Sequence, residues 1–259
     1  MARTALVTGA SSGIGREIAK ELDKRGFRLI LAARRADRLE ELAAQLNDTR
    51  VITCDLSRED ECRRLYDEVK NEKVTVLVNN AGFGKLGRFE QIPLEDELRM
   101  IDTNVRAVHI LTKLFLRDLI EEDRGYILNV ASSAGLMPGG PLMAAYYATK
   151  AYVTSLTSSI YEELKMADSR VKISALCPGP VDTEFNRVAN ADFGVKAITP
   201  EYCAKCGVEG MFAGKLIIIP ERGLDIASKA AQLAPRRMIL AVTGQLQSAK
   251  KKEDNDASL

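Results

Sequence analysis

Short apolar runs alternate along this chain with segments whose apolar residues recur at helical spacing. The apolar runs lie near residues 4–8, 27–33, 50–53, 74–79, 125–130, 171–176 and 215–219. The stretches 29–33 and 74–78 are apolar almost throughout, which is typical of parallel strands that are buried on both faces of a sheet. We therefore expect seven strands in one parallel sheet.

The segments between these runs have the periodicity of amphipathic helices. They lie near residues 14–25, 36–46, 57–70, 94–119, 145–167, 199–213 and 223–233. Regular alternation of strands and helices predicts an α/β fold, a doubly wound parallel seven-stranded sheet of Rossmann-like type with helices on both faces. Such sheets bind ligands beyond the carboxyl ends of their strands.

A single domain over residues 1–247 accounts for the pattern, because the chain has 259 residues and no visible repeat. Residues 248–259 include few apolar side chains, and we expect a disordered tail there. The stretch 236–242 allows two interpretations. It is either a basic amphipathic helix for a membrane surface or, more simply, a terminal helix packed on the domain.

Composition and charge narrow the classes of partner. The net charge of +1 gives no electrostatic footprint for nucleic acid, and no apolar run approaches the ~18 residues of a membrane span. The first strand begins almost at once, so we expect no targeting segment. Five cysteines, an odd number, favour reduced thiols and a cytoplasmic location.

Cys203 and Cys206 have the spacing of a redox or metal pair, but the sequence offers no second pair. They follow Thr199 and Pro200, which form a helix N-cap and first helical position. We interpret them as ordinary helix cysteines and expect no metal site. His109 lies inside a helical pattern and is interpreted as a packing residue.

A glycine-rich turn from Thr8 to Gly15 connects the first strand to the first helix. Strand, turn and helix together provide the context of a dinucleotide site, in which backbone N–H groups and the helix N-terminus bind a pyrophosphate. The glycine spacing differs from Gly-x-Gly-x-x-Gly. A turn that binds nothing is therefore the alternative that this motif alone leaves open.

Tyr146 and Lys150 lie four residues apart, which places both side chains on one face of a helix. A free tyrosine has a pKa near ~10, and a neighbouring ammonium favours the phenolate. We therefore expect Lys150 to lower the pKa of Tyr146, so that the tyrosine exchanges a proton with an alkoxide or alcohol.

These motifs and others in the same order resemble the short-chain dehydrogenase/reductase family, in its single-domain branch of about 250 residues. The resemblance covers about residues 3–245. It rests on the turn at 8–15, Asp55-Leu56, Asn79-Asn80-Ala81-Gly82, Asn104, Ser132 with Gly135, Tyr146 with Lys150, and the stretch Pro178 to Thr183.

The resemblance implies a catalytic group of Asn104, Ser132, Tyr146 and Lys150. Tyr146 acts as the general acid in reduction, Lys150 lowers its pKa and binds the nicotinamide ribose, and Asn104 holds a water. The serine, which binds the substrate oxygen, is either Ser132 or Ser133. The family's Ser-x-x-Gly pattern selects Ser132, whereas its usual serine-to-tyrosine gap selects Ser133. An extra residue in the loop 138–141 absorbs the difference, so we choose Ser132.

The second strand ends in Arg34 and Arg35, where NAD enzymes of this fold place a carboxylate for the ribose 2′-OH. Guanidinium groups match phosphate in geometry and charge, so we predict NADP(H) as the cofactor. The alternative is that both arginines are solvated loop charges.

By resemblance, Asp55 lies near the adenine, Asn79 beside the adenine ribose, and Thr183 binds the nicotinamide carboxamide. The full predicted cofactor site is Gly9, Ser11, Ser12, Gly13, Ile14, Gly15, Arg34, Arg35, Asp55, Leu56, Asn79, Ala81, Gly82, Tyr146, Lys150, Pro178, Gly179, Val181 and Thr183.

The segments 136–143 and 184–198, which are rich in Leu, Met and Phe, are expected to cover a bulky apolar ketone or alcohol. A hydroxysteroid, a 3-oxoacyl thioester and a xenobiotic carbonyl all remain open. The leading hypothesis is an NADPH-dependent carbonyl reductase or alcohol dehydrogenase. The alternatives are an NADP-binding regulatory protein on the same fold that has lost its chemistry, and a purely structural partner protein.

The long helices near 94–119 and 145–167 resemble those that form subunit interfaces in this family. The second contains many small residues, which allow close approach of helices. We therefore expect a symmetric homodimer or homotetramer.

Overall fold

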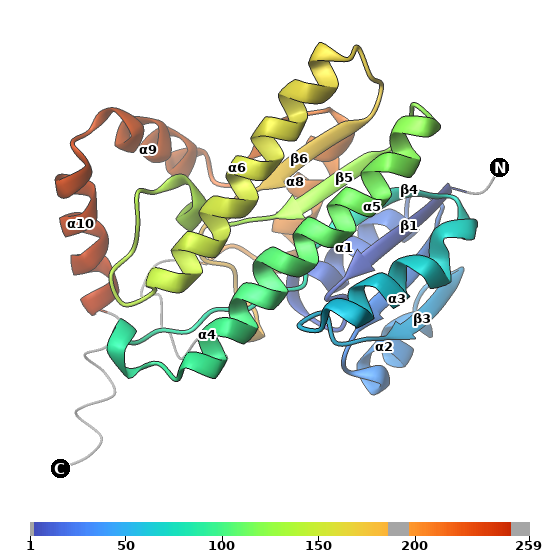
Figure 1. Cartoon of the computed structure of the whole chain (residues 1–259), viewed down its shortest axis with the longest axis horizontal. Coiled ribbons are helices and arrows are strands. Elements are labelled where there is room, and N and C mark those ends of the chain that lie inside the picture. Colours follow the sequence, from blue (N-terminus) through green and yellow to red (C-terminus); the bar gives the residue numbers. More distant parts are fainter. Residues whose placement is uncertain (1–2, 186–196, 250–259) are drawn as a thin grey trace.

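A computed structural model of the chain describes residues 3–185 and 197–249 (Figure 1). Seven strands form one sheet in the order β3-β2-β1-β4-β5-β6-β7, and every pairing is parallel. The strands are β1 (Arg3–Thr8), β2 (Phe27–Ala33), β3 (Thr49–Thr53), β4 (Val74–Asn79), β5 (Tyr126–Val130), β6 (Lys172–Leu176) and β7 (Ile217–Ile218). The predicted α/β fold is confirmed.

Helices lie on both faces of the sheet. They are α1 (Gly13–Asp23), α2 (Ala36–Ala43), α3 (Glu59–Val69), α4 (Leu94–Ile101), α5 (Val108–Glu121), α6 (Ala144–Met166), α8 (Pro200–Phe212), α9 (Arg222–Leu233) and α10 (Arg236–Ala249). Short 3-10 helices occur at η1 (Lys70–Glu72), η2 (Phe89–Gln91) and η4 (Ser133–Leu136). The terminal helix is longer than expected, because α10 includes the first two residues of the predicted tail.

Two apolar cores follow from the alternation of side chains along each strand. Ala5 and Val7 of β1 pack with α1, α2 and α8 on one face, whereas Leu6 points to the other face and packs with α3, α5 and α6. Because both faces are buried, the central strands need apolar residues at every position. This is why they read as continuous apolar runs.

The predicted helix over 94–119 is divided. A π-helical segment, η3 (Asp102–Ala107), separates α4 from α5 and contains the fully buried Asn104. Such π-helical turns are rare and often mark functional sites. The sequence pattern did not reveal it, because one extra residue per turn hardly changes the apolar spacing.

The terminal helix α10 packs on the domain, which is the simpler of the two interpretations offered for this stretch. Arg236 Nη2 donates to Pro138 O at 3.2 Å, and Gln247 Nε2 donates to the Tyr147 hydroxyl at 2.9 Å. These contacts bring the C-terminal region over the loop that precedes α6.

Helix α8 begins as predicted, with Thr199 as its N-cap and Pro200 as its first residue. Cys203 is buried in that helix, Cys206 is half-buried, and the five cysteines are free thiols.

His109 is exposed on α5 and is hydrogen-bonded to Tyr152 of α6 at 2.6 Å, so it packs against a surface tyrosine rather than in the core. Among the described residues, no helix has the length and apolarity that crossing a membrane requires.

Candidate active site

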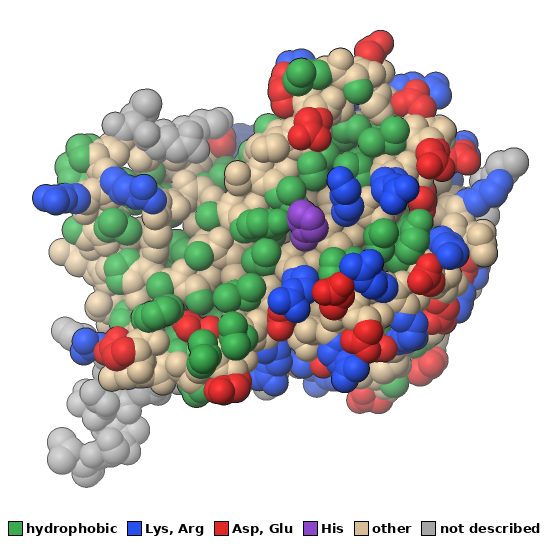
Figure 2. Space-filling model, viewed as in Figure 1, with side chains coloured by type: hydrophobic (Ala, Val, Ile, Leu, Met, Phe, Trp, Pro, Cys, Tyr) green, Lys and Arg blue, Asp and Glu red, His purple; other side chains and the backbone are tan. Residues whose placement is uncertain are grey.

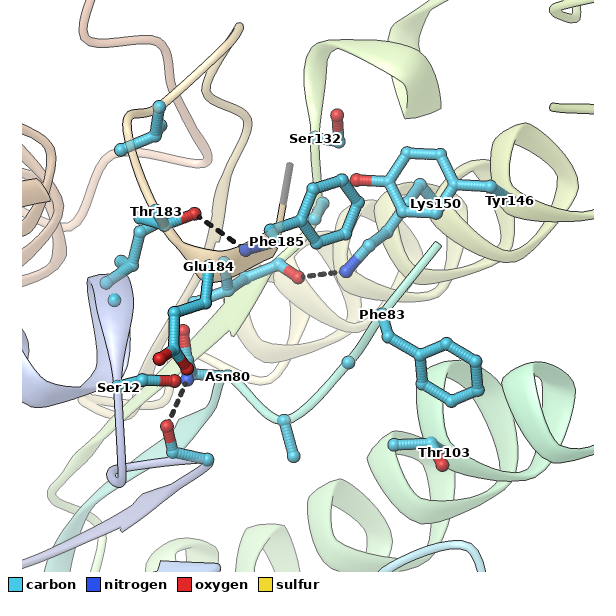
Figure 3. A pocket seen from close by; sticks show the side chains of 18 of the residues that line it. Ser12, Asn80, Phe83, Thr103, Ser132, Tyr146, Lys150, Thr183, Glu184 and Phe185 are labelled. Atoms are coloured by element: carbon cyan, nitrogen blue, oxygen red, sulfur yellow. Dashed lines mark hydrogen bonds between the residues drawn. The ribbon is translucent and has the colours of Figure 1, made fainter. Parts of the chain in front are cut away.

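A cleft of about 670 Å³ opens at the carboxyl edge of the sheet (Figure 3). Its walls come from the segments that follow β1, β2, β3, β4, β5 and β6, and from α6. Nearly all of the predicted cofactor residues line it. The exceptions are Gly15 and Asn79. Among the predicted catalytic residues, Asn104 does not line the cleft and is fully buried behind its lining residues.

The glycine turn forms one end of the cleft. Gly9 and Gly13 adopt φ values of 64° and 55°, a region that disfavours side chains. At Gly9 a Cβ atom would lie 2.8 Å from Ala81 Cα, so the turn also needs glycine for its contact with the segment after β4. The turn ends at the N-terminus of α1, where Ser12 is the N-cap residue. This arrangement is suited to an anionic pyrophosphate.

Asn79 and Asn80 point in opposite directions. The Asn79 side chain is buried in the interior, where its Nδ2 donates to Thr112 Oγ1 and Asn129 Oδ1. Asn80 lines the cleft, and its Nδ2 donates to the carbonyl oxygens of Thr8 and Gly9 at 3.0 and 3.1 Å. Asn80 therefore supports the nucleotide turn. The predicted place of Asn79 beside the adenine ribose stays a prediction, although its side chain lies in the interior and does not line the cleft.

Asp55 and Leu56 line the cleft after β3, as expected for an adenine site. Asp55 Oδ1 accepts hydrogen bonds from the Ser57 backbone N–H and hydroxyl at 3.0 and 2.9 Å. These bonds hold the carboxylate at the start of the turn toward α3.

Arg34 and Arg35 both line the cleft, but their surroundings differ. Arg34 is exposed. Arg35 donates to Ser12 Oγ at 2.8 Å and to Glu184 Oε2 at 2.9 Å. Glu184 also accepts from Arg38 Nη1 at 2.5 Å, and the two arginines lower its pKa to about 2. Neither Glu184 nor Arg38 was among the predicted cofactor residues.

Tyr146 and Ser132 meet at the opposite end of the cleft from the glycine turn (Figure 3). Tyr146 belongs to the first turn of α6, and Ser132 is the N-cap residue of η4. Ser132 lies beside the Tyr146 hydroxyl and acts to lower the pKa of the tyrosine. Ser133 also lines the cleft, but it has no such effect on the pKa of Tyr146.

Gly135 explains the local geometry of the serine segment. A Cβ atom at this position would lie 2.6 Å from Thr154 Oγ1 and 2.7 Å from the carbonyl carbon of Lys150. Only glycine lets η4 lie directly on α6, and this contact sets Ser132 beside Tyr146. The Ser-x-x-Gly spacing used to choose Ser132 thus has a packing basis.

Lys150 is buried, and its Nζ donates to Val130 O at 2.8 Å. The ammonium lies 5.9 Å from the centre of the Tyr146 ring. A Cβ atom at Gly82 would lie 3.5 Å from Lys150 Nζ and 2.9 Å from Asn104 Oδ1. Glycine at position 82 therefore leaves room for both side chains behind the cleft.

Burial dominates the proton equilibria of this pair. It raises the pKa of Tyr146 to about 12, against the opposing effect of the nearby Ser132 side chain, and it lowers the pKa of Lys150 to about 8. The expected depression of the Tyr146 pKa is therefore not produced by the protein groups alone. The physical reason is that Lys150 is itself desolvated and directs its ammonium to a carbonyl.

Asn104 is held rigidly by its amide. Its Oδ1 accepts from Phe83 N at 3.1 Å, while its Nδ2 donates to Phe83 O at 2.8 Å and to Thr149 Oγ1 at 3.2 Å. These bonds connect η3 to the segment after β4 and to α6. The water-holding role that the family resemblance implies stays a prediction.

The substrate side of the cleft mixes apolar and polar groups. Phe83, Met143, Tyr147 and Phe185 supply apolar surface, and the Phe185 ring lies 5.4 Å from the Tyr146 ring. The polar lining residues that sequence reasoning missed are Lys85, Arg99, Thr103 and Gln247. They come from distant segments and share no motif. Phe193, Val195 and the other predicted substrate residues at 186–196 lie outside the described residues.

The family model described as short chain dehydrogenase matches residues 3–193. The chain is 38% identical over 210 residues to an uncharacterized short-chain type dehydrogenase/reductase of Sinorhizobium fredii, which covers 78% of this chain and 82% of that protein. It is 32% identical to a very-long-chain 3-oxoacyl-CoA reductase of Anas platyrhynchos, over 79% of this chain and 67% of that protein.

A solved structure gives the same result. The short-chain dehydrogenase from Sphingobium yanoikuyae, in complex with NADPH, superposes with a TM-score of 0.79 at 28% identity and covers 90% of this chain and 96% of that chain. Together with the parallel seven-stranded sheet and the ordered motifs, these matches establish that the chain belongs to the short-chain dehydrogenase/reductase family of oxidoreductases.

Proposed function

We propose that this oxidoreductase interconverts a ketone or aldehyde with the corresponding alcohol and uses NADP(H) as the hydride carrier. One observation carries the proposal: a buried Tyr146, with Ser132 beside it and Lys150 on the same helix face, shares a cleft with a glycine turn and two arginines. The bound nicotinamide would supply or accept the hydride. A regulatory protein that binds NADP but catalyses no reaction would need none of Tyr146, Ser132 and Lys150.

The residues fit ketone reduction. A pKa of about 12 keeps Tyr146 protonated at neutral pH, so its hydroxyl is ready to give a proton to a forming alkoxide. Ser132 is placed to hold the same oxygen beside the tyrosine. Lys150, with a pKa of about 8, is mostly protonated at pH 7 and stabilises the phenolate that forms when Tyr146 has given up its proton.

The arginines support NADP(H) over NAD(H). In NAD enzymes of this fold an acidic residue at the end of the second strand binds the ribose 2′-OH and repels a phosphate. Here Ala33 is followed by Arg34 and Arg35, and both line the cleft. The protein of similar structure from Sphingobium yanoikuyae binds NADPH, which agrees with this choice.

The proposed substrate is bulky and mainly apolar. Phe83, Met143, Tyr147 and Phe185 provide a surface that favours a steroid-like or 3-oxoacyl-like carbonyl compound. Lys85 and Arg99, which both pair with Asp96, leave a cationic rim at the same side. A panel of steroid ketones, 3-oxoacyl thioesters and bulky aryl ketones, assayed by NADPH oxidation, tests this part of the proposal.

We also propose that the protein is a cytoplasmic homo-oligomer. The free thiols agree with a reducing compartment. The exposed face of α5 and α6 carries Tyr152 beside His109, with small residues at 148, 155 and 159. Figure 2 shows hydrophobic side chains on one side of the histidine and Lys and Arg side chains on the other. The hydrophobic part of this face suits close approach of a second subunit.

Replacing Arg34 should shift the cofactor preference. In Arg34→Asp a carboxylate would face the 2′-phosphate, and one lost charged hydrogen bond is worth about 1.5–3 kcal/mol, so the Kd for NADPH should rise at least about tenfold. The Kd for NADH should change little or fall. Lys205→Asp, at an exposed site on α8, is the matched charge control. Equal losses for both cofactors, or a wild type that prefers NADH, would refute the assignment.

The two serines should differ in their effect on turnover. Ser132→Ala should lower kcat for ketone reduction by roughly 10²-fold, because a donor aimed at developing oxyanion charge is worth about 2.7–4 kcal/mol. Ser133→Ala should be milder. Steady-state kinetics of both variants under saturating NADPH checks this. The choice of Ser132 is wrong if Ser133→Ala proves to be the crippling change.

Removing the Tyr146 hydroxyl should nearly abolish hydride transfer, because the alkoxide then has no acid beside it. Tyr146→Phe should keep NADPH binding and the fold. Tyr147→Phe is the control: it removes a hydroxyl that bonds to Gln247, and its kcat should stay near that of the wild type. Wild-type turnover in Tyr146→Phe would overturn the mechanism.

The same chemistry sets a pH dependence. Because burial lowers the pKa of Lys150, its positive charge is lost as the pH rises through about 8. The kcat/KM for ketone reduction should therefore fall above that pH. A rate that stayed level from pH 7 to 10 would contradict the role given to Lys150.

An arginine in the centre of the α5–α6 face should separate the subunits. Ser155 is exposed on α6, and Ser155→Arg would bury a bulky cation in the proposed interface. Light scattering at micromolar concentration should show an oligomer for the wild type and a smaller species for this variant. Asn71→Arg, at an exposed position away from this face, is the control. A monomeric wild type would contradict the proposed assembly.

A further inference from the structure

Glu184 and Phe185 are neighbours in the chain that reach the two functional ends of the cleft (Figure 3). The Glu184 side chain extends toward Ser12 in the glycine turn, whereas the Phe185 ring points to Tyr146. Both follow Thr183, whose Oγ1 accepts a hydrogen bond from Phe185 N at 3.3 Å. The two side chains are therefore separated by a single peptide unit although they lie at opposite ends of the cleft.

The Glu184 carboxylate bridges two arginines. Arg35 Nη1 donates to Oε2 at 2.9 Å, and Arg38 Nη1 donates to Oε1 at 2.5 Å. Arg35 is also bonded to Ser11 and Ser12 of the glycine turn. An anion thus already lies among the guanidinium groups that follow β2, where the proposed function requires the 2′-phosphate of NADP(H) to bind.

The Phe185 ring is fitted closely against the catalytic tyrosine. A Cβ atom at Gly84 would lie 2.8 Å from Phe185 Cζ and 3.0 Å from Tyr146 Cδ2. Glycine at position 84 therefore lets this ring rest beside Tyr146, on the side of the cleft where the reacting carbonyl must approach. The ion pairs of Glu184 hold this arrangement from the cofactor side.

We propose that Glu184 is a carboxylate stand-in for the 2′-phosphate, which NADP(H) displaces from Arg35 and thereby releases Phe185 from Tyr146. The inference rests on the proposed preference for NADP(H). A phosphate monoester offers more charge and three acceptor oxygens, so it competes well with a carboxylate for a guanidinium group. NAD(H), which has a hydroxyl at this position, cannot displace the carboxylate. Glu184 then acts as a positioning residue that makes access to Tyr146 depend on the cofactor.

The first test measures the competition directly. Adenosine 2′,5′-bisphosphate and AMP serve as probes, because they differ only in the 2′-phosphate and neither carries a nicotinamide. Glu184→Gln should bind the bisphosphate about fivefold or more tightly than the wild type, with little change for AMP, because the amide no longer competes for the arginines. Asp182→Asn is the matched control. It removes the same charge from an exposed position two residues away and should change both affinities little.

The second test follows Phe185. The sequence contains no tryptophan, so Phe185→Trp introduces a single tryptophan beside Tyr146, whose emission is excited at wavelengths that the tyrosines do not absorb. The bisphosphate should change this emission although it does not reach the nicotinamide end, and AMP should not. Combining Phe185→Trp with Glu184→Gln should bring the emission of the free protein toward that of the bisphosphate complex and remove most of the response.

The outcomes separate this inference from the proposed function. If the wild type binds the bisphosphate no better than AMP, both the NADP(H) preference and the role of Glu184 fail. If the wild type prefers the bisphosphate but Glu184→Gln binds it equally or more weakly, the carboxylate supports the arginines rather than competing, and the inference alone is wrong. An unchanged reporter on bisphosphate binding would likewise overturn the link to Phe185.

Discussion

The parallel direction of all seven strands is the constraint on which the site depends. Because every pairing is parallel, the segments after β1, β4, β5 and β6 leave the sheet at the same edge. The strand order reverses between β1 and β4, and it is there that the helices diverge and leave a crevice. The parallel sheet brings the glycine turn, Asn80, Ser132 and Thr183 to this crevice, and hydrogen bonds from Asn80 to Thr8 and Gly9 then tie the turn to the segment after β4.

Close backbone contacts at three glycines bring the predicted catalytic residues together. Gly82 leaves room for Asn104 and Lys150, Gly84 for Tyr146 and Phe185, and Gly135 for the contact between η4 and α6. As a result, the Lys150 ammonium and the Tyr146 phenol are almost fully buried where they line the cleft. Burying a charge is costly unless it finds a partner, and the Val130 carbonyl supplies one for Lys150. The same burial that positions these groups shifts both of their pKa values away from water values.

The fold could be predicted from the sequence because the central strands are buried on both faces, which forces an apolar side chain at nearly every position. The site could be predicted as far as its residues belong to one contiguous segment. The glycine turn and the Tyr146–Lys150 pair are such cases, since strand–turn–helix context and helical spacing fix their geometry locally. The choice of Ser132 depended on a spacing pattern whose physical cause, the packing of Gly135 on α6, only the structure reveals.

The features that could not be predicted depend on contacts between distant segments, or on the balance between burial and neighbouring groups that sets a pKa. The π-helical segment at Asn104 disturbs apolar spacing too little to be read. The pKa of Tyr146 is set by burial against the effect of neighbouring groups, and a sequence does not give the burial. The hydrogen bonds of Asn80 to the nucleotide turn were not predicted, because their acceptors in Thr8 and Gly9 lie 72 and 71 positions away. Glu184 was overlooked because its partners, Arg35 and Arg38, lie 149 and 146 positions away.

The position of Glu184 has a consequence for how the two halves of the cleft act together. Its ion pairs are partly exposed, and such pairs in isolation contribute little to stability. The Glu184 ion pairs lie at the cofactor end of the cleft, one residue from the Phe185 ring at the catalytic end, and they add little to the stability of the fold. Exchange with a cofactor phosphate therefore explains them better than support of the fold does. In the proposed exchange, the low cost of breaking the ion pairs allows a phosphate to replace the carboxylate, and the single peptide unit between Glu184 and Phe185 carries the change toward Tyr146. The 2′-phosphate of NADP(H), which takes no part in hydride transfer, would then contribute binding energy that prepares the site for the substrate.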